Sequence, residues 1–226
     1  TERKLATQSL QQAERRFRSI FENAAEGIFQ TSPDGRYLNV NPALVRIFGY
    51  GSPDQFIASV RGMHHQLYTD RARRAEFMRI LKKDGAVNNF NVEIGRPDGS
   101  RIWVSESARA VHDEAGNLLF YEGTVEDITA TRLNQEMLVH LANHDALTNL
   151  PNRLLMTERL QQMMLNAQRK NNISAVVLVD LDHFKLINDT YGHDRGDQFL
   201  QTMAQRMLGC VRDSDTVARL GGDEFV

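Results

Sequence analysis

The chain has 226 residues, with 27 lysines and arginines against 29 aspartates and glutamates, which gives a formal net charge of −2. This near balance argues against a general nucleic-acid-binding protein, because such proteins usually carry a basic excess. Apolar residues make up 41% of the chain, which is enough to bury a core. No apolar run approaches the roughly 18 residues of a membrane span, and no signal peptide opens the chain. The single cysteine, Cys210, excludes an internal disulfide framework and favours a cytoplasmic setting.

Residues 1–20 are predicted to form one amphipathic helix. Apolar side chains recur there at alternating steps of four and three, which places them on a single seam (Ala6, Leu10, Ala13, Phe17 and Ile20). We expect this segment to be an N-terminal signalling helix. Because the chain begins with Thr1 and not with methionine, we also expect it to be a piece of a longer protein.

From Glu26 to Asp127 the sequence changes to short strands separated by tight turns. Two strands flank the turn residues 32–35, and Asn41 with Pro42 provides the N-cap and first turn of a short helix. After a helical middle, three strands follow, with turns near Asp98 and Asn117, and Phe90, Val92 and Ile94 alternate with polar residues in the first of these strands. Two strands, a helical middle and three antiparallel strands predict a small cupped sheet of the α+β class.

This region resembles a PAS sensor domain. The resemblance rests on three stretches, which are Phe21–Ile28, Asp34 to Ala43 and Gly123–Thr129. It implies a PAS domain over residues 21–128, whose cup binds haem, flavin, a small metabolite or no ligand at all. The sequence does not choose among these ligands, so the PAS ligand stays unknown.

Three histidines are candidates for a haem ligand in this domain, namely His64, His65 and His112. A surface or hydrogen-bonded histidine is the more common situation for each of them. No cysteine lies in the domain, which disfavours the flavin photoreceptors that need one. A basic helical stretch is interpreted most simply as a solvated face (Arg71, Arg73, Arg74, Arg79, Lys82 and Lys83).

Residues 129–144 are predicted to form a helical linker to the second half of the chain. Leu133, Met137 and Leu141 are four apart, and neither glycine nor proline interrupts the segment. Such a helix transmits a change in dimer packing, or acts as a passive spacer; the sequence leaves both open.

The second half contains carboxylates placed where a buried strand is expected to end. Residues 173–179 form an almost unbroken apolar run, which is typical of a strand buried on both faces, and Asp180 follows directly. A second short strand over 216–220 leads into Gly221 and Gly222, which permit a tight turn before Asp223. If the two strands are neighbours, Asp180 and Asp223 converge. Hard oxygen ligands of this kind suit Mg²⁺ in nucleotide chemistry.

The ordered set of motifs resembles the GGDEF family of diguanylate cyclases, which condense two GTP into cyclic di-GMP and release pyrophosphate. The matching stretches are Asp145–Arg153, Asp180 to Asp189, Tyr191 to Asp197, and Arg219 to Phe225. The resemblance implies a GGDEF domain over residues 145–226, truncated after its signature motif. The implied fold is α+β throughout, with the PAS sheet and helices joined by the helical linker to a truncated palm-type α/β cyclase sandwich.

The resemblance also implies site residues. Asp180, the carbonyl of Leu181 and Asp223 would hold Mg²⁺ or Mn²⁺, and Asp223 or Glu224 would relay the proton of the attacking 3′-hydroxyl. The phosphates would meet Lys185 and the backbone around His183 and Phe184. The remaining substrate-binding residues would be Asn188 and Asp197, which pair with the guanine edge, and His193. Arg212 and Asp215 match an Arg-x-x-Asp site for inhibition by cyclic di-GMP, and because the motif is short, a polar helix-to-strand turn is a reasonable alternative.

The leading hypothesis is a sensor-regulated diguanylate cyclase that acts as a homodimer through its PAS and linker helices, because two bound GTP molecules must meet. One alternative is a module that only senses GTP or cyclic di-GMP and regulates an attached domain. Another is a PAS dimerisation piece with an incomplete passenger. Because the chain stops at Val226, directly after the signature motif, we expect this truncated chain by itself to be inactive.

Overall fold

The computed structural model describes residues 2–60, 67–170 and 172–226, and the chain divides into two compact units. We call residues up to Leu133 the N-terminal unit and Asn134–Val226 the C-terminal unit, and we describe each by itself. None of the helices in the described residues combines the length and the apolar character that a bilayer crossing needs.

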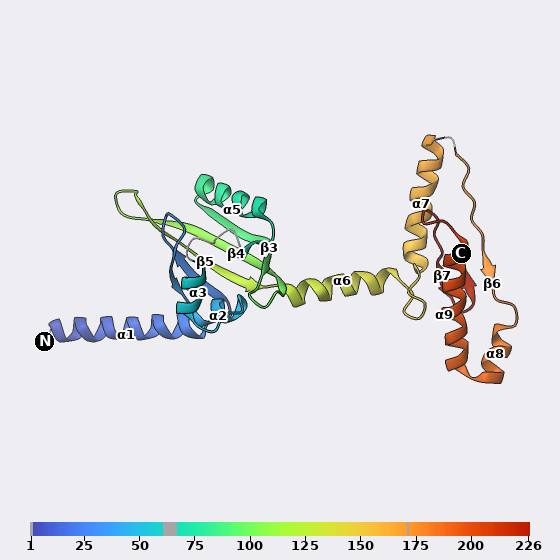
Figure 1. Ribbon diagram of the computed structural model, residues 1–226, viewed down its shortest axis with the longest axis horizontal. Coiled ribbons are helices and arrows are strands. Elements are labelled where there is room, and N and C mark those ends of the chain that lie inside the picture. The colour runs from blue at the N-terminus through green and yellow to red at the C-terminus, as the bar shows by residue number, and fades with distance from the viewer. Residues whose placement is uncertain (1, 61–66, 171) are drawn as a thin grey trace. The chain divides into compact units, whose positions relative to one another are not determined.

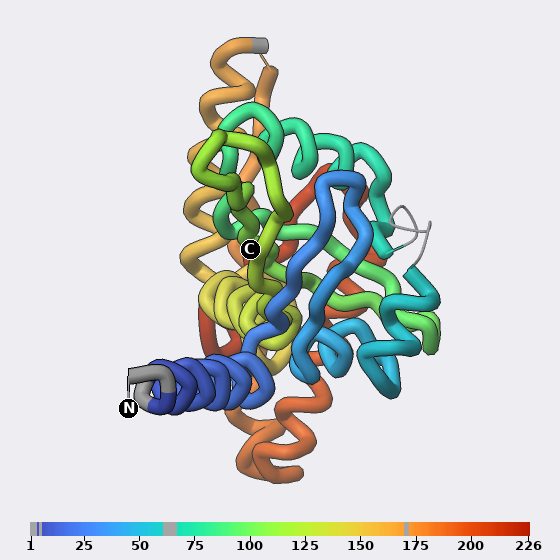
Figure 2. The backbone as a smooth tube through the Cα atoms, turned by 90° about the vertical axis from the view of Figure 1, so that its left-hand side faces the viewer, coloured from blue at the N-terminus to red at the C-terminus, as the bar shows by residue number. Residues whose placement is uncertain are grey.

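The N-terminal unit is an antiparallel sheet with helices, in the predicted α+β arrangement (Figure 1). Its elements in chain order are α1 (Glu2–Asn23), β1 (Gly27–Thr31), β2 (Tyr37–Val40), α2 (Pro42–Ile47), α3 (Pro53–Val60), α5 (Arg71–Asp84), β3 (Ala86–Gly95), β4 (Arg101–His112) and β5 (Leu118–Asp127), followed by the start of α6 (Thr129–Asn143). The five strands lie in the order β2-β1-β5-β4-β3, so the first hairpin adds to β5. Figure 2 shows that hairpin in blue, beside the green strands of the second half of the sheet.

The predicted helix cap at Asn41 is confirmed and connects three segments of this unit. The Asn41 side chain accepts hydrogen bonds from the backbone N–H of Leu44 at 2.9 Å and of Ile28 at 2.8 Å. It also donates to the carbonyls of Phe21 at 3.1 Å and Glu26 at 2.9 Å. One buried carboxamide thus joins the end of α1, the start of β1 and the first turn of α2.

The core of the N-terminal unit follows the predicted alternation of the strands. Every second residue of β3 is buried from Phe90 through Val92 to Ile94, and β4 buries Ile102, Val104, Glu106 and Ala108 in the same way. Aromatic rings fill much of the remaining space, and Phe56 makes edge-on contacts with Tyr37, Phe48 and Tyr50.

The interpretation of the basic stretch of α5 as a solvated face is wrong for Arg74. Its side chain is only 17% exposed and lies 4.0 Å from the Glu106 carboxylate, while its Nη1 donates to the Tyr68 hydroxyl at 3.2 Å. The Tyr68 hydroxyl in turn donates to Glu106. Arg74 points inward because it lies one turn before Phe77 on the buried stripe of the helix.

Of the three histidines that were candidates for a haem ligand, the structure describes one. His112 lies exposed at the end of β4, away from the core, as expected for a surface histidine. His64 and His65 lie outside the described residues.

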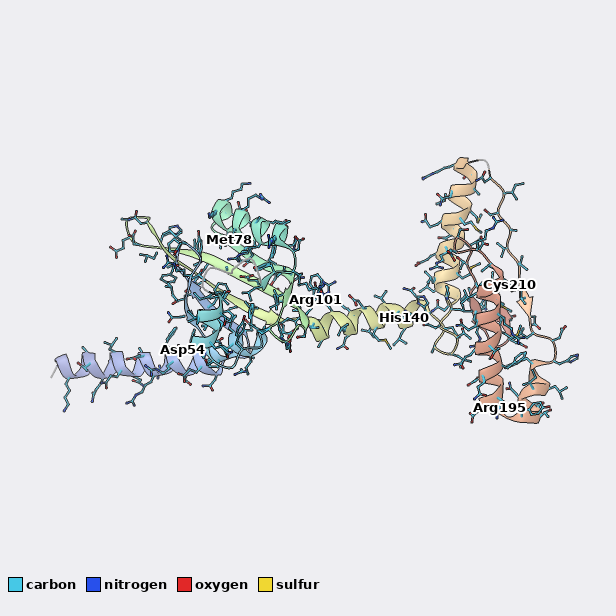
Figure 3. The ribbon with its side chains drawn as sticks, viewed as in Figure 1. Asp54, Met78, Arg101, His140, Arg195 and Cys210 are labelled. Carbon is cyan, nitrogen blue, oxygen red and sulfur yellow. The ribbon has the colours of Figure 1, made fainter. Side chains whose placement is uncertain are left out.

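The C-terminal unit combines a short sheet with helices. After the end of α6 it contains α7 (Arg153–Lys170), β6 (Val179–Asp180), α8 (Phe184–Tyr191), α9 (His193–Cys210), β7 (Arg219–Gly221) and β8 (Glu224–Phe225). The strands lie in the order β6-β8-β7, and both pairings are antiparallel. Leu150, Leu200, Ala204, Val217 and Phe225 form its buried cluster. Figure 3 places Arg195 in the first turn of α9 and Cys210, which is exposed, at its last residue.

The prediction of a buried strand over residues 173–179 is wrong for most of its length. Only Val179 and Asp180 pair with another strand, and the preceding apolar side chains are exposed, from 54% for Val176 to 100% for Ile173. The physical reason is that β8 supplies only two pairing residues, and no other described strand lies beside 173–178. Without a neighbour, an apolar run gains neither ladder hydrogen bonds nor a second layer. The α7 side chain of Met164 is also exposed.

Candidate functional site

The predicted site is built around the short turn between β7 and β8. Gly221 and Gly222 have φ angles of 142° and 55°, both in the positive range that residues with side chains rarely adopt, and the first lies outside the left-handed region open to other residues. A Cβ atom at either glycine would meet no heavy atom within 4 Å, so the turn requires glycine for its backbone and not for space. The turn delivers Asp223, which is half-buried, to the start of β8.

The strand register brings the predicted acidic residues together in part. In the β6–β8 pair Asp180 lies directly opposite Glu224, the neighbour of Asp223. Two carboxylates opposite each other across a ladder repel unless a cation or a basic group compensates them. Arg153 approaches Glu224 at 3.9 Å, but among the described residues neither Asp180 nor Asp223 has an ion-pair partner. In the part of the chain that is described, three or more acidic, histidine or cysteine side chains are not gathered closely enough to form a ready metal cluster.

Arg219, a buried residue that was not among the predicted site residues, holds this turn in place. The Arg219 Nε and Nη2 donate to the Gly222 carbonyl at 3.0 and 2.7 Å, and its Nη1 donates to Asp145 Oδ1 at 2.8 Å. Its backbone N–H donates to the Pro151 carbonyl at 3.0 Å. Arg219 therefore connects the glycine turn to the segment 145–153, which lies far away in the sequence. Arg219 and Asp145 each stand within a motif that carries the family resemblance, but neither motif by itself indicates that the two residues meet.

Asp145 organises the other side of this connection. Its Oδ1 accepts from the Thr148 N–H at 2.9 Å and from the Thr148 hydroxyl at 2.6 Å, in addition to Arg219. Burial acts to raise the pKa of Asp145, but the hydrogen bonds from Thr148 and Arg219 outweigh it and hold the pKa below the ordinary aspartate value. Asp145 is consequently ionised at neutral pH.

The end of the α6 helix contacts the same segment. His140 Nε2 lies 2.6 Å from Asn149 Oδ1, and the His140 ring stacks on His144 with centroids 4.1 Å apart. Figure 3 labels His140 on this helix. Contact of this kind connects the C-terminal end of α6 to the turn that Asp145 organises.

The residues predicted to contact phosphate lie in the segment after β6. His183 has a φ of 62° and precedes α8 without a side-chain cap, and the Leu181 carbonyl accepts from the Phe184 N–H at 3.3 Å. His183 and Lys185 are exposed, while Leu181 and Phe184 are half-buried. The Leu181 carbonyl keeps a second lone pair for another partner.

The residues expected at the guanine lie on α8 and α9. Asn188 is half-buried on α8, whereas His193 and Asp197 are exposed in the first two turns of α9. The two helices pack closely, because Asn188 lies against the buried Gly196.

The predicted product site is a turn between α9 and β7. The Arg212 N–H donates to Asp215 Oδ2 at 3.1 Å, and the Asp215 N–H donates to the Arg212 carbonyl at 2.9 Å. Both side chains are exposed. This geometry satisfies the turn and leaves the Arg212 guanidinium in solvent, so it is compatible with either interpretation of the motif.

Comparison with known families and proteins matches both halves of the chain. The family model of the PAS domain matches residues 25–130, and that of the diguanylate cyclase GGDEF domain matches residues 142–226.

Similar proteins come from bacterial signalling. The chain is 53% identical over 95 residues to the bifunctional diguanylate cyclase/cyclic di-GMP phosphodiesterase MucR of Pseudomonas aeruginosa, covering 42% of the chain and 14% of MucR. It is 39% identical over 151 residues to the cyclic di-GMP phosphodiesterase PdeR of Escherichia coli, covering 66% of the chain and 22% of PdeR. The solved GGDEF domain of TpbB from Pseudomonas aeruginosa is 49% identical over 36% of the chain and 48% of that structure, with a TM-score of 0.36. The chain thus spans less than a quarter of the length of MucR and of PdeR.

Proposed function

Because the chain carries a PAS domain followed by a GGDEF domain, we propose that it is the sensor and catalytic region of a regulated diguanylate cyclase. The reaction would join two GTP molecules into cyclic di-GMP and release two pyrophosphates. The observation that carries this proposal is the β7–β8 turn, where Arg219 holds the Gly222 carbonyl and Asp180 stands opposite Glu224 across the ladder. A degenerate glycine turn, or an Asp180 remote from it, would have favoured another function.

The residues at this turn suit a hard divalent cation. Asp180, the Leu181 carbonyl and Asp223 offer only oxygen ligands, which Mg²⁺ and Mn²⁺ prefer. The placement of Asp180 opposite Glu224 supports the same assignment, since an added cation would relieve the repulsion between these two carboxylates. When bound, the metal would neutralise triphosphate charge and lower the pKa of the attacking 3′-hydroxyl.

The chain's own side chains would perform the other steps. We assign the acceptance of the hydroxyl proton to Asp223 or Glu224, whose carboxylates lie at the turn, and phosphate contact to Lys185. Asn188 and Asp197 would bind the guanine edge, because a carboxylate accepts from the N1 and N2 donors and a carboxamide donates in return. His183, Phe184 and His193 would complete the substrate contacts.

We further propose that the active form is a homodimer. Each GGDEF domain would hold one GTP, and the product needs two. Apolar side chains on α1 and α6 support association, because they are largely exposed in the single chain (Leu10, Phe17, Ile20, Leu133, Met137 and Leu141).

A sensing module without catalysis is the second candidate. The similarity to PdeR, whose name describes a phosphodiesterase, favours this candidate, since a GGDEF domain can accompany a different activity. In that case GTP or cyclic di-GMP would bind and regulate an attached domain, with no turnover at Asp223.

The test is to incubate the full-length protein with GTP and Mg²⁺ and to follow cyclic di-GMP and pyrophosphate by chromatography. Asp180→Asn and Asp223→Asn should abolish product while the fold stays intact, because each loses a hard anionic ligand. Glu158→Gln is the matched control, since Glu158 is an exposed acid on α7 outside the turn. GTP binding without product in the wild type would favour the sensing module, and near-normal turnover in either variant would contradict the site assignment.

A further inference from the structure

The contact between α8 and α9 depends on the absence of a side chain at Gly196. A Cβ atom at this buried position would lie 1.8 Å from Asn188 Oδ1 and 3.3 Å from Phe184 Cζ. The first distance is far inside van der Waals contact. The φ of Gly196 does not lie in the positive region, so this glycine is required for space and not for backbone conformation.

Asn188 has an unusual environment for a polar side chain. Among the described residues, its Oδ1 is the one buried side-chain nitrogen or oxygen that lacks a hydrogen-bond partner. Buried acceptors are normally satisfied, because leaving one unpaired forfeits its hydration without compensation. The chain keeps the carboxamide in this orientation although Oδ1 loses its hydration. This indicates a role for the other polar atom of the carboxamide, Nδ2, which can only donate.

We infer that Gly196 is a positioning residue for base selection, which rests on the proposed function. The space beside Gly196 accommodates Asn188 Oδ1. With Oδ1 held there, the carboxamide presents its Nδ2 to the base. A donor at that place pairs with the O6 acceptor of guanine and meets the N6 donor of adenine unfavourably. Gly196 would thereby contribute to the choice of GTP over ATP without touching either nucleotide.

The effect of a substitution at Gly196 should appear in binding and not in folding. The atom that a new Cβ would strike is the end of a flexible side chain, which can rotate away. Alanine is also the better helix former, so the helix itself is not weakened. Gly209 is the matched control, because it lies on the same helix, is exposed, and has no heavy atom within 4 Å of an added Cβ.

The experiment measures, in the full-length protein, the Kd of the α,β-methylene analogues of GTP and ATP. Gly196→Ala should reduce the preference for the GTP analogue about tenfold, the effect of one lost hydrogen bond to the base, and Gly209→Ala should leave it unchanged. In an Asn188→Ala background, adding Gly196→Ala should have no further effect, because both changes remove the same donor. Asn188→Asp, which replaces the donor by an acceptor and leaves Gly196 in place, should lose the preference as well.

The outcomes separate this inference from the proposed function. A wild type that binds both analogues equally would overturn the proposed function and this inference with it. A selective wild type whose Gly196→Ala variant is folded and equally selective would overturn the inference alone. Equal losses in the two glycine variants would assign the effect to the helix and also refute it. If Gly196→Ala fails to fold, unchanged selectivity of Asn188→Asp would still contradict the inference.

Discussion

Removal of the Asp145 carboxylate should loosen the glycine turn that lies at the proposed active site. In Asp145→Ala, the N–H and hydroxyl of Thr148 lose their acceptor, and the buried Arg219 loses the partner that it contacts at 2.8 Å. The Arg219 guanidinium would keep the Gly222 carbonyl as its remaining partner. The turn should therefore become more mobile, and the C-terminal unit less stable.

The magnitude follows from the three lost contacts. The bonds from Thr148 and Arg219 all run to an ionised carboxylate, and such charge-assisted bonds contribute about 1.5–3 kcal/mol each when well shielded and less where solvent screens them. The Asp145 side chain is 22% exposed, which favours the lower end for the ion pair. We expect a loss of about 3 kcal/mol in Asp145→Ala and about 1 kcal/mol in Asp145→Asn, which keeps an acceptor oxygen. Asp213→Ala, at an exposed acid of the same unit, should change the unfolding free energy by less than about 0.5 kcal/mol.

Hydrogen exchange of residues 145–152 and 219–225 measures this effect, together with urea unfolding followed by circular dichroism. The single tryptophan, Trp103, lies on β4 of the N-terminal unit, so its fluorescence transition should stay unchanged and serves as an internal control. Because the pKa of Asp145 is lowered in the folded state, its contribution is full above the unfolded-state pKa. It should be lost as the pH falls through the lowered value. Equal exchange in Asp145→Ala and Asp213→Ala would refute the reasoning.

Three further predictions concern other parts of the chain. Asn41→Ala removes four hydrogen bonds and should lower the unfolding free energy of the N-terminal unit by about 3 kcal/mol. Urea unfolding followed by Trp103 fluorescence measures this loss, and a loss under about 1 kcal/mol would contradict the prediction. Burial raises the pKa of Glu106, so the wild-type N-terminal unit should lose stability as the pH rises through that pKa. Glu106→Gln should remove this pH dependence of the melting temperature, and equal pH profiles of the two proteins would contradict the prediction. Arg212→Ala should relieve inhibition by cyclic di-GMP, and superimposable inhibition curves would identify the motif as a plain turn.

The local patterns of the N-terminal unit were sufficient to predict most of its elements. Alternation over Phe90, Val92 and Ile94 predicted a half-buried strand, and Asn41 before Pro42 predicted a helix start, because these signals depend on the chain's immediate neighbours. The exposed run 173–178 shows the opposite case. A run of β-branched residues has a strand preference, but its burial depends on partner strands that its own composition does not specify.

Those features of the candidate site that depend on residues adjacent in sequence could be predicted. The turn at Gly221 and Gly222 could be predicted because glycine is the residue that best accepts positive φ, and the φ of 142° at Gly221 lies outside the left-handed region open to other residues. The bond from Arg219 to Asp145 could not, since it joins positions 74 residues apart that only the folded chain brings together. The close approach of Asn188 to Gly196 likewise depends on how two helices pack, although the residues are only eight positions apart.

The buried pair of Arg74 and Glu106 shows how a charge pattern can be misinterpreted and how it could have been recognised. Arg74 was grouped with its basic neighbours, but it precedes Phe77 and Leu81 by three and seven positions, so it belongs to the apolar stripe of α5. Glu106 likewise occupies an inward position of β4, between Val104 and Ala108 in the alternation. A charge at a core position of one element requires a compensating charge or hydrogen bond from another element. Arg74 and Glu106 are opposite charges at positions where the pattern of each element predicts a buried apolar residue, and together they therefore predict a contact between α5 and β4. The Tyr68 hydroxyl hydrogen-bonds to both side chains.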